Sequence, residues 1–338
     1  MKRYLGVDLH RNCWTVCTLR EDGQSQLREW VLKDLKAFAR TVTASDEVAV
    51  ESTGNTRLFC EALRPRKCRV VVVNPHQFQV ISKSVKKTDE HDAQLLATFL
   101  SKDLLPEVRM KAPHQARIAS LAQTRDKLVK LRTTLKNKIN NLLAARGILL
   151  RKESLASERG LERVLSAPVE ALERVELEIL VGQIRHLNEG IARVEQVLRA
   201  EGPKLPGYQN LTSIKGIGDV GACILLSTIG PIADFADEGK LAAYFGIVPR
   251  VANSNETERS GRITKRGNKL GRTALVQCAL IAARYSPYLQ TYYRRIAAAR
   301  GSGKAIIALA RKFLGIIYRT LKNNWVFEDF PRFVLANG

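Results

Sequence analysis

The 338-residue sequence is poor in aromatic residues, which make up 6% of it, and contains no long apolar run. A membrane-spanning helix needs about 18 to 20 consecutive apolar residues. No basic amphipathic helix flanked by aromatic residues is present either, which argues against a membrane-surface protein. The start MKRYLGVDLH lacks an apolar core, so we expect no signal peptide. We therefore expect no membrane partner.

The sequence contains cysteine but lacks the cysteine spacing of a metal site. None of the six cysteines forms a CxxC pair, so no zinc site is indicated. Most of them stand in apolar contexts such as VQCAL, and scattered thiols of this kind favour a reducing cytoplasm. The segment GSGKA near the C-terminus lacks the first glycine and the final Ser or Thr of a phosphate-binding loop, which excludes ATP binding by that motif.

Acidic residues are too few to balance the basic ones. The 33 Asp and Glu residues face 55 Lys and Arg residues, giving a net charge of +22. The excess lies in two regions, with 13 basic against 4 acidic residues over 101–153 and 19 against 8 over 206–338. Such a surface attracts polyanions, and nucleic acid is the partner that we expect. Hydrophobic residues reach 45%, enough for a core in each of two or three domains.

The first hundred residues predict an α/β domain. Three strands, a helix, a strand, a helix and a strand follow one another, at 3–9, 13–20, 26–32, 32–42, 47–53, 56–63 and 68–75. Near-continuous apolar strands such as CRVVVVNP are typical of a sheet covered on both faces.

The rest of the chain predicts helices. Leucines recur every seven residues in the helix predicted at 115–146, and a heptad seam runs from Leu177 to Leu198. These two helices can pair within one chain or between chains. Further helices are predicted on both sides of the glycine turn in LTSIKGIGDVGACILLSTIG and at about 268–284, 287–300 and 303–323. We predict three domains, α/β at 1–105, a coiled-coil hairpin at 106–202 and an all-α domain at 203–338.

Four acidic residues of the first domain form a candidate metal site. Asp8 ends the first strand and Glu51 ends the fourth, so neighbouring strands would bring both to one edge of the sheet. Asp89 and Asp92 open a predicted helix three residues apart and share a face of it. Clustered carboxylates suit Mg²⁺ or Mn²⁺. Each acid taken alone has a structural alternative, as a turn residue or, for Asp89, a helix cap.

The polar loop RVANSNETERSGRITKRG, residues 250–267, offers a candidate nucleophile. It holds Ser254 and Ser260, and the residues alone do not choose between them. Several cations in and near the loop and before the acidic helix are candidate phosphate contacts: Lys86, Lys87, Arg259, Arg262, Lys265, Arg266, Lys269 and Arg272. The turn glycines Gly216 and Gly218 either approach a phosphate or only connect two helices.

The motifs GVDLH, VAVESTG and TDEHDAQLLA, followed by LTSIKGIGDVGACILLSTIG and the serine loop, resemble one known family along nearly the whole chain. That family is the DEDD transposases of IS110-type (Piv/MooV-like) insertion sequences, whose N-terminal domain is similar to the RuvC resolvase, an RNase H-like fold. The resemblance implies a prokaryotic, nucleoid-associated DNA recombinase that is a dimer or tetramer. It also implies a structured guide (bridge) RNA that pairs with donor and target DNA.

The resemblance also assigns roles to residues. It implies that Asp8, Glu51, Asp89 and Asp92 bind divalent metal and that a serine forms a covalent link to DNA. The family serine lies seven residues before Gly-Arg-Ile, which selects Ser254. Here it is flanked by Asn253 and Asn255 instead of Gln and Gly, and Asn tolerates a positive φ. The alternatives are a metal-dependent junction nuclease without serine chemistry and a non-catalytic nucleic-acid-binding protein.

Overall fold

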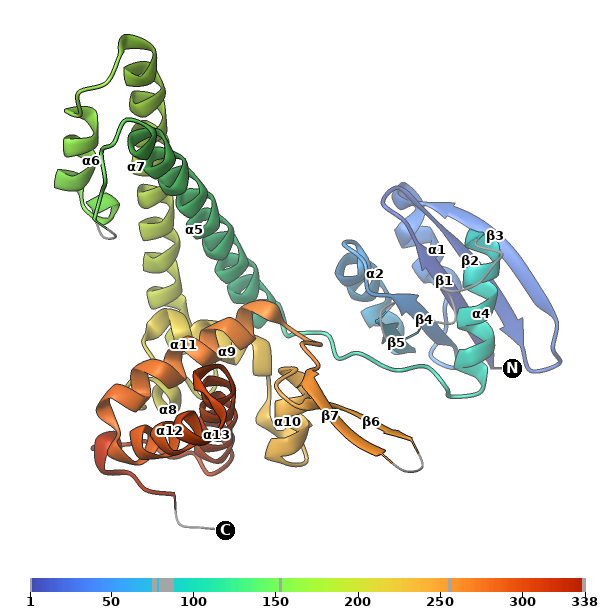
Figure 1. Cartoon of the computed structure of the whole chain (residues 1–338). Coiled ribbons are helices and arrows are strands. Elements are labelled where there is room, and N and C mark those ends of the chain that lie inside the picture. The colour runs from blue at the N-terminus through green and yellow to red at the C-terminus, as the bar shows by residue number, and fades with distance from the viewer. Residues whose placement is uncertain (1, 75–77, 79–87, 152–153, 255–256, 336–338) are drawn as a thin grey trace. The chain divides into compact units, whose positions relative to one another are not determined.

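The computed structural model describes residues 2–74, 78, 88–151, 154–254 and 257–335, with the side chains of 154 and 251–260 left out. The chain divides into two compact units, Met1–Met110 and Lys111–Gly338 (Figure 1). The first unit is mixed α/β and the second is mainly helical, as expected. No helix in the described ranges is long and apolar enough to cross a membrane.

A five-stranded mixed sheet forms the centre of the first unit. Its strand order is β3-β2-β1-β4-β5, in which β1, β2 and β3 pair antiparallel and β1, β4 and β5 pair parallel. The strands are β1 Arg3–Leu9, β2 Cys13–Arg20, β3 Ser25–Val31, β4 Glu47–Glu51 and β5 Arg69–Val73. The predicted order of elements is confirmed, and the arrangement is consistent with an RNase H-like domain.

Helices cover both faces of this sheet, as the apolar strands predict. Side chains alternate along a strand, so Leu5, Val7 and Leu9 face one way and Gly6 and Asp8 the other. The first face packs on α1 (Leu35–Thr41) and α2 (Thr56–Leu63) in one buried cluster. The second face packs on α4 (Asp89–Ser101), whose Leu96 lies against β4 and β5 residues. The face with α4 is therefore the one that carries Asp8.

A long helical hairpin begins the second unit. Helices α5 (Pro113–Ala145) and α7 (Ala171–Glu201) run antiparallel and pack against each other within the chain, which is the first of the two pairings left open by the sequence. Arg125 contacts Glu195 at 2.7 Å near one end, and Arg146 contacts Glu173 at 2.6 Å near the other. The connection, predicted as a turn, also contains a short helix, α6 (Glu158–Leu165), whose Leu161 packs into the apolar core at the far end of the hairpin.

The remaining helices form one apolar core. These are α8 Tyr208–Thr212, α9 Asp219–Ile229, α10 Glu238–Tyr244, α11 Lys269–Tyr285, α12 Pro287–Arg300 and α13 Ser302–Lys322. The three closing helices begin and end within a residue of their predicted bounds. The base of the hairpin joins the same core through Ile118 of α5 and Leu198 of α7. A two-stranded ribbon of β6 (Pro249–Ser254) and β7 (Thr257–Ile263) extends from this helical body (Figure 1).

Candidate functional site

The sheet register places Asp8 and Glu51 side by side. Strands β1 and β4 pair in parallel with Val7 opposite Val50, so the next residue on each strand is an acid. The expectation that these two strands are neighbours is confirmed. Gly6 and Ala49 lie on the face of the sheet that α4 covers. Asp8 and Glu51 each stand two residues further along the same strand, so they lie on that face too. Asp8 is 9% exposed.

The first turn of α4 brings two more acids to this face. Thr88 is the N-cap and accepts a hydrogen bond from the His91 amide. Asp89 is thus the first helical residue, and Thr88, not the Asp89 carboxylate, caps the helix. Asp92, one turn later, is buried at 7% exposure. Negative charge here also interacts favourably with the positive end of the helix dipole.

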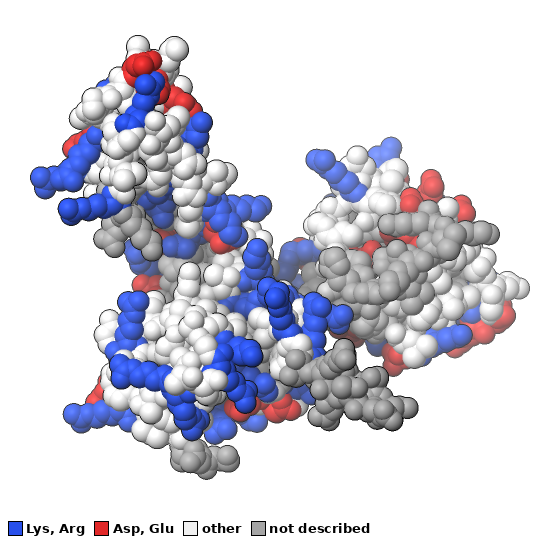
Figure 2. All heavy atoms as spheres, in the orientation of Figure 1, with Lys and Arg blue, Asp and Glu red and all other residues white. Residues whose placement is uncertain are grey.

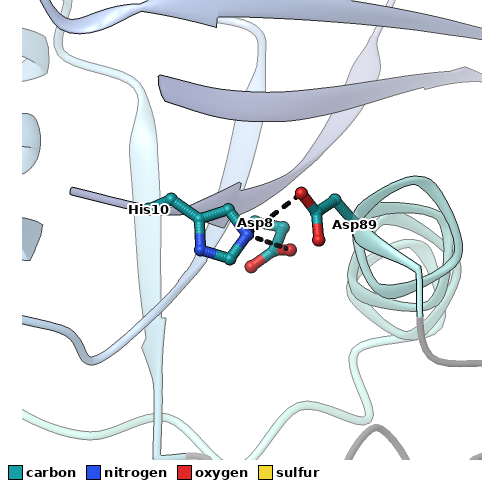
Figure 3. A group of neighbouring side chains, drawn as sticks. All are labelled: Asp8, His10 and Asp89. Carbon is teal, nitrogen blue, oxygen red and sulfur yellow. Dashed lines mark ion pairs between the residues drawn. The ribbon is translucent and has the colours of Figure 1, made fainter. Parts of the chain in front are cut away.

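Asp8 and Asp89 converge on the ring of His10 (Figure 3). The His10 Nε2 atom lies 3.2 Å from an Asp8 oxygen and 3.2 Å from an Asp89 oxygen. Burial raises the pKa of the Asp8 carboxyl, His10 opposes the rise, and the charges of Asp89 and Asp92 add to it. Burial alone would lower the pKa of His10, but the two carboxylates outweigh it, and the pKa is raised. The mutual repulsion of these acids means that a cation stabilises the cluster.

The donor set of this cluster fits a divalent ion. One ligand atom each from Asp8, His10 and Asp89 all lie within 4.8 Å of one another. Asp92 is close enough for its charge to affect Asp8, and Glu51 follows the neighbouring strand on the same face. Carboxylate oxygens are the ligands that Mg²⁺ and Mn²⁺ prefer, and a mixed set with one imidazole is also compatible with Mn²⁺.

His10 is the member of this cluster that we did not predict. A signal was available, because residues i and i+2 of a strand face the same side, and His10 stands two positions after Asp8. The sequence gives no sign of how the loop after β1 is held. Asn55 does this, since its side-chain amide donates to the His10 carbonyl at 2.8 Å and to the Arg11 carbonyl at 2.9 Å.

Ser254 ends strand β6 beside the tip of the ribbon. It pairs in register with Thr257, and residues 255 and 256, including the Asn255 that flanks Ser254, lie outside the described part. Ser260 pairs with Val251, well inside the ribbon. The backbone thus places the two serines differently, one beside the tip and one in the strand.

At the base of the ribbon, the segment before β6 and the segment after β7 cross with their backbones in close contact. A Cβ on Gly246 would lie 1.9 Å from the Arg266 carbonyl oxygen, and one on Gly267 would lie 2.1 Å from that of Tyr244. Both glycines have positive φ, at 67° and 93°. Arg272 of α11 donates to the carbonyls of Phe245 at 3.1 Å and Lys265 at 3.3 Å. Arg272, which we predicted as a phosphate contact, therefore has a second task, joining both sides of this crossing.

The other candidate phosphate contacts that the structure describes face solvent. Arg262, Lys265, Arg266 and Lys269 are exposed, and Figure 2 shows Lys and Arg spread over the visible face of the Lys111–Gly338 unit with few acids among them. Their role in phosphate binding stays a prediction. The Arg259 side chain and residues Lys86 and Lys87 lie outside what the structure describes.

The two turn glycines differ in their surroundings. A Cβ on Gly216 would lie 2.6 Å from the backbone nitrogen of Ala282, so α11 occupies the space beside it. Close helix packing accounts for Gly216, which favours the structural alternative there. Gly218 caps the N-terminus of α9 and has open space around it. Its role toward phosphate stays a prediction.

Comparisons with known proteins match both units. Residues 5–146 match the DEDD_Tnp_IS110 transposase family, and residues 208–294 match the family described as Transposase IS116/IS110/IS902. The chain is 27% identical over 329 residues to a transposase for insertion sequence element IS1111A of Coxiella burnetii, covering 94% of this chain and 89% of that protein. It is 25% identical to the pilin gene-inverting protein of Moraxella bovis, covering 97% and 98% of the two chains.

The two family matches follow each other in chain order, and the relatives align along nearly the whole sequence. The mixed sheet that carries Asp8 and Glu51 lies in the first match, and the ribbon with Ser254 lies in the second. The protein therefore belongs to the IS110 family of DEDD transposases.

Proposed function

We propose that this transposase cuts and rejoins DNA with two groups, a divalent metal held by Asp8, Glu51, Asp89 and Asp92, and the hydroxyl of Ser254. The observation that carries the proposal is the convergence of acids on one face of the sheet, from β1, β4 and the first turn of α4. A bound divalent ion at this place supplies Lewis-acid stabilisation of the scissile phosphate.

Ser254 is the proposed nucleophile. Its Oγ attacks phosphorus, the bond from phosphorus to one DNA oxygen breaks, and that strand end leaves as a hydroxyl after taking up a proton. The phosphoserine ester keeps the energy of the broken bond, so the hydroxyl of another strand can attack it and release the serine. A recombinase needs this reversibility. Two observations support Ser254 as the nucleophile. It lies beside the tip of an extended ribbon, and it has the family spacing to Gly261.

The partners that we propose are donor and target DNA and a structured guide RNA. The exposed cations after the ribbon and the basic helical unit give a surface suited to phosphate backbones. Aromatic residues for stacking bases are few, which fits a protein that leaves sequence reading to base pairing. Strand exchange needs more than one active site, so we also propose a homo-oligomer, dimer or tetramer.

The serine step is tested with matched variants of the full chain, expressed from a plasmid that keeps the DNA on both sides of the coding sequence. Wild type should give a protein–DNA adduct that survives denaturing electrophoresis. Ser254→Ala should remove the adduct and recombination, while Ser260→Ala, the control in the same ribbon, should keep both. Asp8→Asn should remove both.

The outcomes separate the alternatives. DNA cleavage by Ser254→Ala together with an inactive Asp8→Asn means a metal-dependent junction nuclease. Full binding and no cleavage by any variant, wild type included, means a non-catalytic DNA-binding protein. The guide is tested by sequencing the RNA that copurifies with wild type. A defined RNA from the flanking DNA, with segments complementary to the joined sites, is the expected result, and random cellular RNA contradicts it.

A further inference from the structure

The loop that carries His10 is fixed before any ligand binds. The His10 amide donates to the Cys13 carbonyl at 3.0 Å, which closes the turn between β1 and β2. The Asn55 side chain holds the His10 and Arg11 carbonyls from the segment that follows β4. The first residue of β2 and the N-cap residue of α2 thus fix the backbone of His10. A side chain on such a support has a defined position.

The ring of His10 points between two carboxylates rather than at one. Its Nε2 atom is equally far, at 3.2 Å, from Asp8 and from Asp89 (Figure 3). A single N–H makes its best hydrogen bond with one acceptor, in line with the bond. Three ligand atoms within 4.8 Å of one another can also share one cation. Ligands at about 2.1 Å in octahedral geometry have neighbours about 3 Å apart.

His10 does not need this position for its own solvation. Its side chain is 48% exposed, so water can satisfy both ring nitrogens. The contact is therefore not a buried polar group finding a partner. His91, by contrast, stands between Asp89 and Asp92 in sequence and belongs to no such cluster in the described residues.

We propose that His10 is a nitrogen ligand of the metal in this transposase, beside Asp8 and Asp89. This rests on the proposed metal site and extends it from four carboxylates to a mixed nitrogen and oxygen set. Imidazole favours transition ions over Mg²⁺, whereas carboxylates serve both. The wild-type site accordingly binds Mn²⁺ more tightly than Mg²⁺, and His10 is the source of a large part of that difference.

The test uses metal-free full-length protein and Mn²⁺ alone. Pulsed electron paramagnetic resonance of the bound ion should detect ¹⁴N coupling from a coordinated imidazole, replaced by ¹⁵N coupling after histidine labelling. His10→Gln should lose the coupling and bind Mn²⁺ about tenfold more weakly, with Mg²⁺ affinity changed less than about threefold. His91→Gln, the matched control on α4, should keep both the coupling and the affinity.

Two failures are distinguishable. If Asp8→Asn binds Mn²⁺ as wild type does, the metal site itself is wrong, and the role of His10 fails with it. If Asp8→Asn loses Mn²⁺ while His10→Gln keeps the ¹⁴N coupling and the affinity, the acidic site stands and only the ligand role of His10 is overturned. Circular dichroism of each variant shows whether it is folded, and Asp8→Glu provides a second probe should Asp8→Asn not fold.

Discussion

Gly6 of β1 lies directly against the backbone of Ala93 in α4. A Cβ at position 6 would be 2.0 Å from the Ala93 carbonyl oxygen and 2.4 Å from the Ala97 nitrogen. The helix therefore rests on the strand at a separation that only glycine allows. Because Asp8 is two residues further along β1 and Asp89 and Asp92 open α4, this one contact sets the spacing between acids from distant parts of the sequence.

Gly6→Ala should consequently disturb both stability and the metal site. The atoms in the way belong to backbone, so α4 must shift, and overpacking of this kind costs about 1–3 kcal/mol. Mn²⁺ affinity should fall with it, because Asp89 and Asp92 move with the helix. Calorimetric melting and Mn²⁺ titration measure the two effects. Gly54→Ala is the control, since a Cβ there meets nothing within 4 Å, and an equal loss in both variants would contradict the packing argument.

Asp46 predicts a pH dependence in the same unit. Its side chain is fully buried and accepts from Arg3 at 2.9 and 2.6 Å and from the Thr43 amide at 2.7 Å. Burial alone would raise its pKa, but these hydrogen bonds outweigh it, and the pKa is lowered from 3.8. A lowered pKa stabilises the folded state above the unfolded value, and that contribution is lost as the pH falls through the folded one.

Asp46→Asn should therefore destabilise the protein at pH 7 by about 2 kcal/mol. This is less than the loss expected from breaking a fully buried ion pair, because the Arg3 side chain is about a third exposed. The difference in the free energy of unfolding between wild type and variant should shrink below about pH 3.8. Urea unfolding at several pH values measures it. Asp22→Asn, the same change in an exposed turn, is the control. A constant difference across the acid range would show that packing, not charge, is responsible.

The sequence predicts what depends on local pattern and neighbouring strands. Alternation and apolar runs indicate the strands that carry Asp8 and Glu51, and the spacing of three indicates the helix face of Asp89 and Asp92. It predicts poorly what depends on contacts between loops. The fixing of His10 by Asn55 joins segments 45 residues apart. The hydrogen bonds from Arg272 to the carbonyls of Phe245 and Lys265 depend on a close approach of two backbone segments that no periodicity encodes.

Arg272 tests how the serine ribbon is held. Arg272→Gln removes charged hydrogen bonds to two carbonyls and should cost about 1–2 kcal/mol. Hydrogen exchange should rise in β6 and β7, because the crossing at Gly246 and Gly267 loses its link, and Arg272→Lys should restore part of the protection. Exposed Arg262, changed to Gln, is the control. Unchanged exchange in Arg272→Gln would leave phosphate contact as the only role for this residue.

Exposed Arg266 and Lys269 should act through charge alone. If each contacts a phosphate, changing it to Gln lowers the slope of log affinity against log salt by about 0.9 on duplex DNA, with melting temperature unchanged. Binding of a fixed DNA at several salt concentrations measures the slope. Lys215→Gln, distant in sequence and placed beside Tyr285, is a control for general charge loss. Equal slopes for wild type and both variants would remove these residues from the proposed interface.

Helix α7 presents an apolar stripe that tests the proposed homo-oligomer. Leu172, Val175 and Ile179 are 86%, 55% and 61% exposed and share one face by their spacing of three and four. Changing Val175 and Ile179 together to Glu should lower the molar mass measured by light scattering, because the new carboxylates of one copy would repel those of the other across the contact. Leu131→Glu, equally exposed on α5, should leave the mass unchanged. A monomeric wild type contradicts the oligomer, and an oligomer that survives the double change places its contact on another surface.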